Sequence, residues 1–244
     1  MIEPQSSRSN NTEPADYDLV AAEYYDAQRH PTCANFGELS VRFLGERILK
    51  LAPPGSRILE VGAGRSIVAP ILADAGRPLA SLTLLDESAA MLAHSAEWQS
   101  RSVAMIVADA CATALRAANY DVIVASLCDP YNRPAFWQEM TRLLSPNGCC
   151  LATLPAHEWV ACFRDGGKID DAEFVLADGR RIAMPSFVPP VERQLAMVAA
   201  AGLQVIDMAT FSAADLTGTP SPKLNVFAPG SKAPVLRGLT SVKA

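Results

Sequence analysis

The chain has 244 residues, 50% of them hydrophobic and 19% charged, with a formal net charge of −5 and a pI near 5.3. This length and composition fit one large globular domain or two small ones, with enough apolar residues for a substantial core. The acidic balance disfavours an extended nucleic-acid interface, and no apolar run in the sequence approaches the roughly 20 residues of a membrane helix.

The first segment, residues 1–15, is polar and is expected to be a disordered tail. It lacks the apolar stretch of a secretory signal, which favours a cytoplasmic protein. The six cysteines form no C-x-x-C pair, and Cys149 and Cys150 would point to opposite faces of a strand. We therefore expect buried free thiols, typical of a reducing compartment. The three histidines lie far apart in the sequence, so no metal site is predicted.

Residues 16–36 carry closely spaced tyrosines and apolar residues that predict a short helix ending before Pro31. Residues 36–51 then show the apolar periodicity of an amphipathic helix. Glycines follow in the segment RILEVGAGRS, residues 57–66. A short apolar run leading into a glycine pair is typical of a buried parallel strand that ends in a tight loop. Ser66 can cap the helix that begins beyond this loop.

The string Glu60-x-Gly62-x-Gly64 resembles motif I of the class I S-adenosylmethionine-dependent methyltransferases. In that family the acid and the loop hold the amino-acid end of the cofactor, and another glycine often stands where this chain has Ser66. A dinucleotide fingerprint would need a small residue at Ile67, which disfavours a nicotinamide enzyme. A glycine turn without a ligand is the other interpretation of this segment.

Two further acids follow at strand ends. A helix over 67–75 and a strand over 81–85 lead to Asp86, 24 residues after Gly62, close to the spacing at which an acid meets a ribose hydroxyl. Asp86 could equally begin the helix over 87–98 as a cap. A third strand, residues 103–107, leads to Asp109, and the resemblance implies that this acid meets the adenine amino group. The whole cofactor site expected from the resemblance comprises Tyr25, Glu60, Gly62, Ala63, Gly64, Asp86, Glu87, Asp109, Ala110 and Ser126.

A fourth apolar strand, residues 121–127, leads into Cys128-Asp129-Pro130-Tyr131-Asn132. This order resembles the D-P-P-Y signature of amino methyltransferases that act on planar nitrogens, with one proline missing. Asp129 and Tyr131 are expected to face the acceptor, together with Asn132 and Trp159. Asn132 is also expected to cap the helix over 133–144, and Tyr131 could simply pack on it. His157 is the candidate catalytic base beside Asp129, because a histidine titrates near neutral pH.

The phrase LLSPNGCCLATLP resembles the helix–turn–strand after motif IV of the same family, with a fifth strand over 149–154. Residues 155–188 are expected to form an insertion over the cleft, with a hairpin turning at Asp178-Gly179. A helix up to Ala201 and strands over 203–211 and 223–228 would complete a single domain over 16–228, followed by a loosely held tail over 229–244.

Strands alternating with helices predict a doubly wound, Rossmann-like α/β fold: a mostly parallel sheet with helices on both faces and an antiparallel final strand. The resemblance implies an S-adenosylmethionine-dependent methyltransferase, and we expect a small-molecule acceptor with a nitrogen or oxygen nucleophile. A methyltransferase acting on nucleic-acid or protein amino groups, and a regulatory module that binds the cofactor without catalysis, are the alternatives. The sequence does not indicate the oligomeric state.

Overall fold

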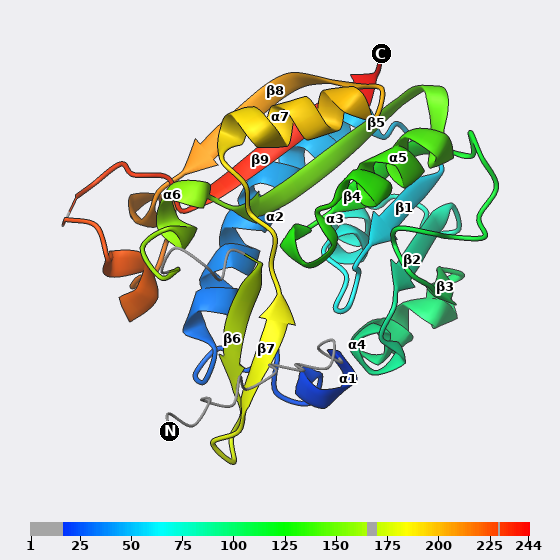
Figure 1. Ribbon diagram of the computed structural model, residues 1–244. Coiled ribbons are helices and arrows are strands. Elements are labelled where there is room, and N and C mark those ends of the chain that lie inside the picture. Colours follow the sequence, from blue (N-terminus) through cyan, green and yellow to red (C-terminus); the bar gives the residue numbers. More distant parts are fainter. Residues whose placement is uncertain (1–16, 165–169, 229) are drawn as a thin grey trace, which may run out of the picture.

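A computed structural model describes residues 17–164, 170–228 and 230–244 of the chain, so the expected disordered tail over 1–15 lies outside the described residues. The described residues form one seven-stranded sheet with helices on both faces (Figure 1). The strand order is β3-β2-β1-β4-β5-β9-β8. The strands are β1 (Ile58–Val61), β2 (Leu82–Asp86), β3 (Ala104–Val107), β4 (Tyr120–Ala125), β5 (Leu144–Pro155), β8 (Leu203–Phe211) and β9 (Leu236–Lys243).

The central strands run parallel and both of their faces are covered, as their continuous apolar sequences predict. Every residue of β1 is buried, and β1 pairs in parallel with both β2 and β4. Val61 lies opposite Leu85 on one side and Ala125 on the other. The residues that follow these three positions therefore meet at one edge of the sheet, which is where ligands bind in doubly wound folds.

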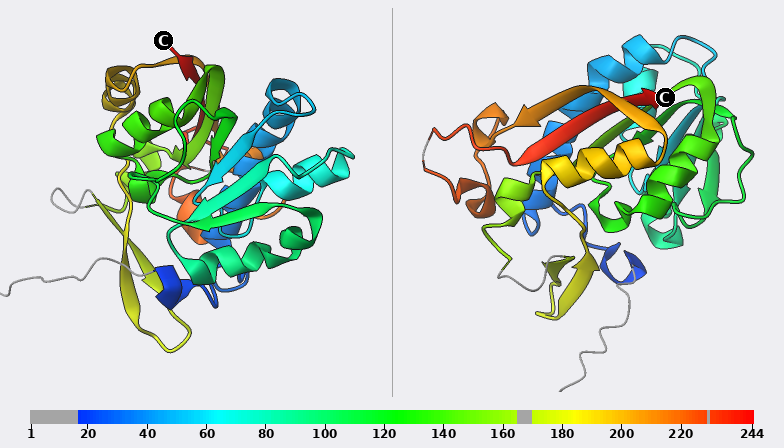
Figure 2. Two further views of the ribbon diagram at one scale, coloured as in Figure 1. Left: turned by 90° about the vertical axis from the view of Figure 1, so that its right-hand side faces the viewer. Right: turned by 45° about the horizontal axis from the view of Figure 1, so that its top comes forward.

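Helices cover the two faces with separate apolar clusters (Figure 2). One cluster joins the sheet to α2 (Pro31–Leu51) and α3 (Val68–Asp74), and the other joins it to α5 (Pro134–Leu143) and α7 (Val191–Ala200). Cys149 lies in the first cluster and Cys150 in the second, so the prediction that they point to opposite faces is confirmed. The other helices of the described residues are α1 (Tyr17–Val20), α4 (Ala89–Leu92), η1 (Ala93–Arg101), η2 (Asp129–Tyr131), α6 (His157–Val160), η3 (Ala213–Asp215) and η4 (Pro222–Asn225).

The prediction for the C-terminal region is wrong in two places. Residues 223–228 form no strand; Pro222–Asn225 is a short 3-10 helix instead. The expected loose tail contains β9, which pairs antiparallel with β5 on one side and β8 on the other. The final strand is antiparallel as predicted, but it comes from residues beyond 229. Four consecutive residues of β9, 238–241, are buried because neighbouring strands and helices enclose them.

The predicted hairpin is present as a separate two-stranded sheet of β6 (Asp171–Val175) and β7 (Arg181–Pro185). It stands beside α1 at the end of the molecule where the chain enters the fold (Figure 1). Phe174 of β6 stacks on Tyr24, with ring centroids 5.7 Å apart and planes 4° apart. We call the stretch that carries Tyr17, Tyr24 and Tyr25 the tyrosine segment. The hairpin and the tyrosine segment are distant in the sequence but share one apolar cluster around Val20.

Candidate functional site

A cavity of about 500 Å³ opens at the carboxyl edge of the sheet. This volume lies in the range of about 300–1,000 Å³ that is usual for small-molecule sites. Its wall takes residues from the ends of β1, β2, β3 and β4, from the tyrosine segment and from the first turns of α2. Nine of the ten residues expected at a cofactor site line it: Tyr25, Glu60, Gly62, Ala63, Asp86, Glu87, Asp109, Ala110 and Ser126.

The glycine loop has the left-handed backbone that its sequence predicts. Gly62 has φ +62° and Gly64, the tenth expected residue, has φ +40°. A Cβ at Gly62 would lie 2.3 Å from the Tyr131 hydroxyl, and one at Gly64 would lie 2.1 Å from the Tyr25 hydroxyl. Any side chain in either place would therefore disrupt this wall, which fits a loop whose backbone must be approached closely.

Glu60 lines the cavity and also bonds to the start of the next helix. Its buried carboxylate accepts a hydrogen bond from the Ser66 hydroxyl and from the backbone N–H groups of Ile67 (2.8 Å) and Val68 (3.3 Å). Ser66 in turn accepts the N–H of Ala69 at 2.9 Å, in the first turn of α3, although the capping position of this helix is Ile67 rather than Ser66. Burial, opposed by these hydrogen bonds, raises the pKa of Glu60 to about 7. The acid thus fixes the loop against the start of α3, and Ser66 supplies a donor that a glycine would lack.

Two acids line the neighbouring strand ends. Asp86 accepts the N–H of Gly64 and that of Ser88, both at 2.9 Å, which ties the end of β2 to the glycine loop. Ser88, rather than Asp86, caps α4 by accepting the N–H of Met91. Burial raises the pKa of Asp86 above its usual value. Asp109 accepts the N–H of Cys111 at 2.7 Å.

Ser126 follows β4 and faces the same cavity. Its hydroxyl oxygen is buried and has no hydrogen-bond partner among the described residues. Buried polar atoms are almost always paired in folded proteins, so this hydroxyl fits a ligand that supplies the missing partner.

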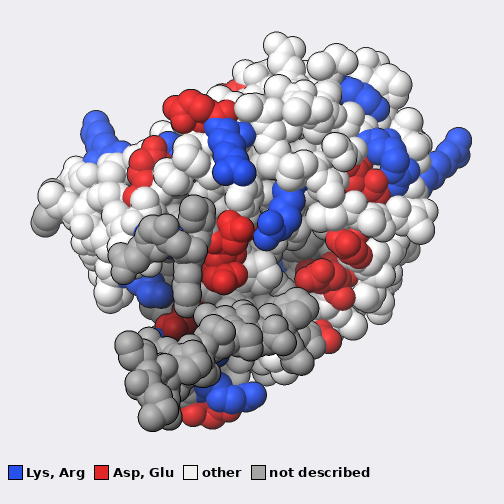
Figure 3. All heavy atoms as spheres, viewed as in Figure 1, with Lys and Arg blue, Asp and Glu red and all other residues white. Residues whose placement is uncertain are grey.

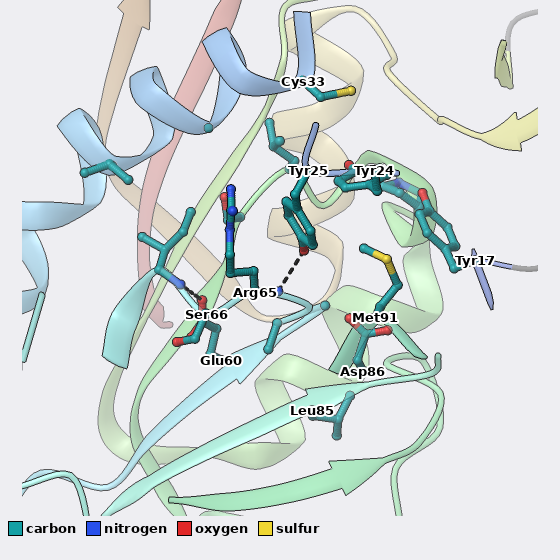
Figure 4. Close-up of a pocket in the computed structure, with 18 of the residues that line it drawn as sticks. Tyr17, Tyr24, Tyr25, Cys33, Glu60, Arg65, Ser66, Leu85, Asp86 and Met91 are labelled. Carbon is teal, nitrogen blue, oxygen red and sulfur yellow. Dashed lines mark hydrogen bonds between the residues drawn. The ribbon is translucent and has the colours of Figure 1, made fainter. Parts of the chain in front are cut away.

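The tyrosine segment closes the other side of the cavity (Figure 4). The hydroxyl of Tyr25 accepts the N–H of Arg65 at 2.7 Å, and the Arg65 guanidinium lies 4.4 Å from the centre of its ring. Burial raises the pKa of Tyr25 to about 12. Tyr17 and Tyr24 also line the cavity, as does Cys33 at the start of α2.

Two neighbouring residues of the loop after β4 were expected to face the acceptor, but only one of them lines the cavity. Tyr131 lines the cavity and donates its hydroxyl to the carbonyl of Val61 at 3.0 Å. Asn132 is fully buried and is bonded to Trp137, Gln194 and the carbonyl of Phe187, so it faces the core. It does not cap α5, because Arg133 is the capping position and no side chain bonds there.

Asp129 is not among the cavity-lining residues, but the next residue, Pro130, lines the cavity. Its carboxylate accepts the hydroxyl of Ser186 at 2.6 Å, and its carbonyl accepts the N–H of Phe187. Burial, opposed by the Ser186 bond, raises the pKa of Asp129 to about 6. Burial, followed by the charge of Asp129, raises the pKa of Tyr17 well above its usual value. Asp129 therefore interacts with the cavity wall from the side where the hairpin meets it.

His157 and Trp159 lie outside the cavity wall, contrary to the prediction. The Nδ1 atom of His157 is 3.0 Å from the carbonyl of Val188. Trp159 donates to the carbonyl of Lys223 and packs edge-on against Phe36. Both lie on α6, which follows β5, and neither is among the residues that line the cavity.

Several wall residues carry no motif signal and were missed. They include Arg65, Met91, Leu127 and the α2 residues Ala34, Gly37, Glu38 and Val41. Leu127 alone among them has an unusual backbone, with φ +51°. The described residues contain no group of three or more His, Cys, Asp or Glu side chains that could hold a metal ion. Nor does any helix in the described ranges have the length and apolar character needed to cross a bilayer.

Comparison with known proteins identifies a methyltransferase domain over residues 58–148. No curated protein matches the chain. Among solved structures, an S-adenosylmethionine-dependent methyltransferase from Mesorhizobium loti is similar at 16% identity, covering 85% of this chain and 100% of its own, with a TM-score of 0.61. The CcbJ methyltransferase from Streptomyces caelestis is similar at 15% identity, covering 97% of this chain and 99% of its own, also with a TM-score of 0.61.

A third similar structure is an S-adenosylmethionine-dependent methyltransferase from Clostridium acetobutylicum, at 10% identity, 93% and 99% coverage and a TM-score of 0.62. At these identities the solved structures establish the fold, and the domain match covers the strands that carry the glycine loop and the acids. The chain therefore carries a methyltransferase domain over residues 58–148, in the fold of the S-adenosylmethionine-dependent methyltransferases, and S-adenosylmethionine is the methyl donor that this domain implies.

Proposed function

We propose that this enzyme transfers the methyl group to a small molecule through a nitrogen or oxygen nucleophile. The observation that carries the proposal is a single cavity that continues from the glycine loop, past Ser126, to the tyrosines and the start of α2. Such a cavity can hold a cofactor and a second small ligand together, whereas a polymer would need an open groove. When bound, S-adenosylmethionine supplies an electrophilic methyl group on a sulfonium.

The cofactor contacts are proposed from the lining. Asp86 retains free acceptor capacity for ribose hydroxyls, because each carboxylate oxygen can accept more than the one backbone bond that it already has. Asp109 and Ala110 would meet the base, and Ser126 would pair its hydroxyl with the amino-acid portion. Glu60 would act through the loop that it fixes, since its oxygens are occupied by Ser66 and α3.

The charge of the cavity wall limits which class of acceptor can bind. Six carboxylates line the cavity, and Arg65 is the one lysine or arginine among the described lining residues; the acids are Glu38, Glu60, Asp74, Asp86, Glu87 and Asp109. A wall of one sign repels ligands of the same sign. We therefore favour a neutral or amine-bearing acceptor over a phosphate or carboxylate compound. On the face shown in Figure 3, acidic and basic side chains lie interspersed, which gives no support to a nucleic-acid surface.

We propose that Asp129 acts on the acceptor from a position next to the lining residue Pro130, although its own side chain is not part of the cavity wall. With a pKa of about 6 it is largely ionised at neutral pH and can take a proton from an attacking amine or hydroxyl. Tyr131 offers a flat face beside it on which a planar acceptor could stack. Ser186 keeps the carboxylate oriented by donating to Oδ2.

The proposal is tested first by calorimetry with S-adenosylhomocysteine, using NAD as the control ligand. Asp86→Asn removes one charge and one acceptor, and we expect its affinity for S-adenosylhomocysteine to fall about tenfold, the effect of a lost charged hydrogen bond. Unchanged affinity would contradict the ribose assignment.

The second test is transfer of a labelled methyl group from S-adenosylmethionine to a cell extract separated into metabolites, protein and RNA. Label in the metabolite fraction, reduced by Asp129→Ala, is the expected result. Label confined to protein or RNA would favour the macromolecular alternative. Cofactor binding without label in any fraction would favour a regulatory module.

A further inference from the structure

The loop after β4 begins with a strained residue. Leu127 has φ +51°, a left-handed conformation that a branched aliphatic side chain rarely adopts. It lines the cavity together with its neighbour Ser126, while its side chain joins a cluster with Phe36 and Trp159. A strained residue persists only where its surroundings hold it, and such residues gather at functional sites.

Thr153 of β5 is what holds it. The N–H of Leu127 donates to the Thr153 hydroxyl at 3.0 Å, and the N–H of the next residue, Cys128, donates to the Thr153 carbonyl at 2.9 Å. Thr153 is fully buried and is not among the cavity-lining residues. The Thr153 hydroxyl therefore supplies the hydrogen bond that is specific to the left-handed turn. The Thr153 carbonyl supplies the ordinary backbone hydrogen bond to the next residue.

The same hydroxyl also reaches α2. It lies 2.9 Å from the hydroxyl of Ser40, which is buried as well. Gly238 of β9 pairs with Thr153, and a Cβ there would lie 2.4 Å from the ring of Phe43, so α2 sits directly on this part of the sheet. Because α2 carries one wall of the cavity and the Leu127 turn carries another, Thr153 joins the two walls.

We propose that Thr153 is a positioning residue of the methyl-transfer site. Its hydroxyl holds the loop from Ser126 to Tyr131 in the turn that faces the cavity and fixes that loop against Ser40 of α2. The inference rests on the proposed function only in assigning the cavity to the cofactor and acceptor. Thr153 does not line the cavity, so we expect it to act through Leu127 rather than by contact with a ligand.

The test is a mutant cycle read by S-adenosylhomocysteine affinity. Thr153→Val keeps the shape of the side chain and removes the hydroxyl, and we expect roughly tenfold weaker binding, the scale of one lost buried hydrogen bond. Thr153→Ser should restore the wild-type value. In a Leu127→Gly background the same Thr153→Val change should cost less than about twofold, because glycine adopts a positive φ without strain.

The matched background is Leu127→Ala. Alanine removes the leucine contacts but keeps the strain, so the tenfold cost of Thr153→Val should persist there. Thr240→Val on neighbouring β9 is the control for the chemistry of the substitution. The Thr240 hydroxyl is buried without a hydrogen-bond partner among the described residues, so its removal should leave binding unchanged.

Amide hydrogen exchange gives a readout that needs no ligand. Thr153→Val should accelerate exchange at Leu127 at least fivefold and leave Cys128 unchanged. Wild-type affinity together with a protected Leu127 amide in Thr153→Val would overturn the proposal, and so would equal costs in the glycine and alanine backgrounds. If Thr153→Val and Thr153→Ala both failed to fold, Thr153 would support the fold as a whole, which also overturns it. Absence of binding by the wild-type protein would refute the proposed function instead, and the exchange measurement would still decide on Thr153.

Discussion

The region from β1 to β4 and the region beyond residue 155 differ in how their structure is determined. In the first, cavity-lining residues end a strand or follow it closely, so Gly62, Asp86 and Ser126 need only a parallel sheet to come together. In the second, position depends on partners far away in the sequence. The hairpin packs on Tyr24, and β9 lies between β5 and β8. Local motifs therefore describe the strand-end side of the cavity, and tertiary contacts decide the side that lies toward the hairpin.

The largest expected effect tests whether the second region carries the fold. Leu239 of β9 is 2% exposed and packs in the apolar cluster with α5 and α7. We expect Leu239→Ala to lower the free energy of unfolding by about 2–5 kcal/mol, as for other buried leucines. Urea denaturation measures it, with the exposed Ile206→Ala of β8 as the control, for which a change under about 0.5 kcal/mol is expected. Equal effects would mean that β9 is only loosely attached.

The next prediction concerns the first region. Gly62→Ala places a methyl group 2.3 Å from the Tyr131 hydroxyl at a positive φ, and we expect S-adenosylhomocysteine affinity to fall by about 100-fold or more, roughly 2.7 kcal/mol. Gly55→Ala is the matched control, because Gly55 also has a positive φ, +92°, but a Cβ added there would have nothing within 4 Å. If both substitutions weakened binding equally, backbone strain rather than close approach would explain the glycine motif.

A pH experiment examines Asp129, which lies where the two regions meet. Its pKa is raised from 3.8 to about 6 in the folded protein, so folding favours the protonated form. The corresponding stability is complete below pH 3.8 and is lost as the pH rises through 6. We expect the wild type to lose about 1–3 kcal/mol relative to Asp129→Asn between pH 4 and pH 7, at about 1.4 kcal/mol for each pKa unit. Parallel pH profiles from thermal unfolding would show that Asp129 is not perturbed.

The smallest expected effect concerns contact between the tyrosine segment and the hairpin. The carboxylate of Glu23 accepts the N–H of Ala177 at 2.8 Å. Glu23→Gln should change global stability by less than about 1 kcal/mol, because the contact is exposed. Hydrogen exchange at Ala177 should nevertheless become faster. We also expect S-adenosylhomocysteine to slow amide exchange in the tyrosine segment and in the hairpin of the wild type. Exchange rates that do not change when the ligand binds would mean that both segments have packing roles alone.

The sequence predicts the parallel strands well because continuous apolar runs and glycine turns are local signals. It does not predict that the Glu60 oxygens are already bonded to Ser66 and α3, because the choice between ligand and backbone depends on geometry. Asn132 looked like a cap, but its amide pairs with Gln194, 62 residues away. β9 was missed because Gly238 interrupts the strand pattern, and strand preference depends on what surrounds the residue.

The position of β9 has a consequence for synthesis on the ribosome. All of its neighbours precede it in the chain, so β5 and β8 emerge from the ribosome while the place between them is empty. Until residues 236–243 emerge, both strands present unpaired backbone edges of the kind that chaperones cover and that pair with other chains. A premature stop codon after residue 230 would spare the glycine loop and every described residue of the cavity wall, yet leave the nascent protein with this open sheet.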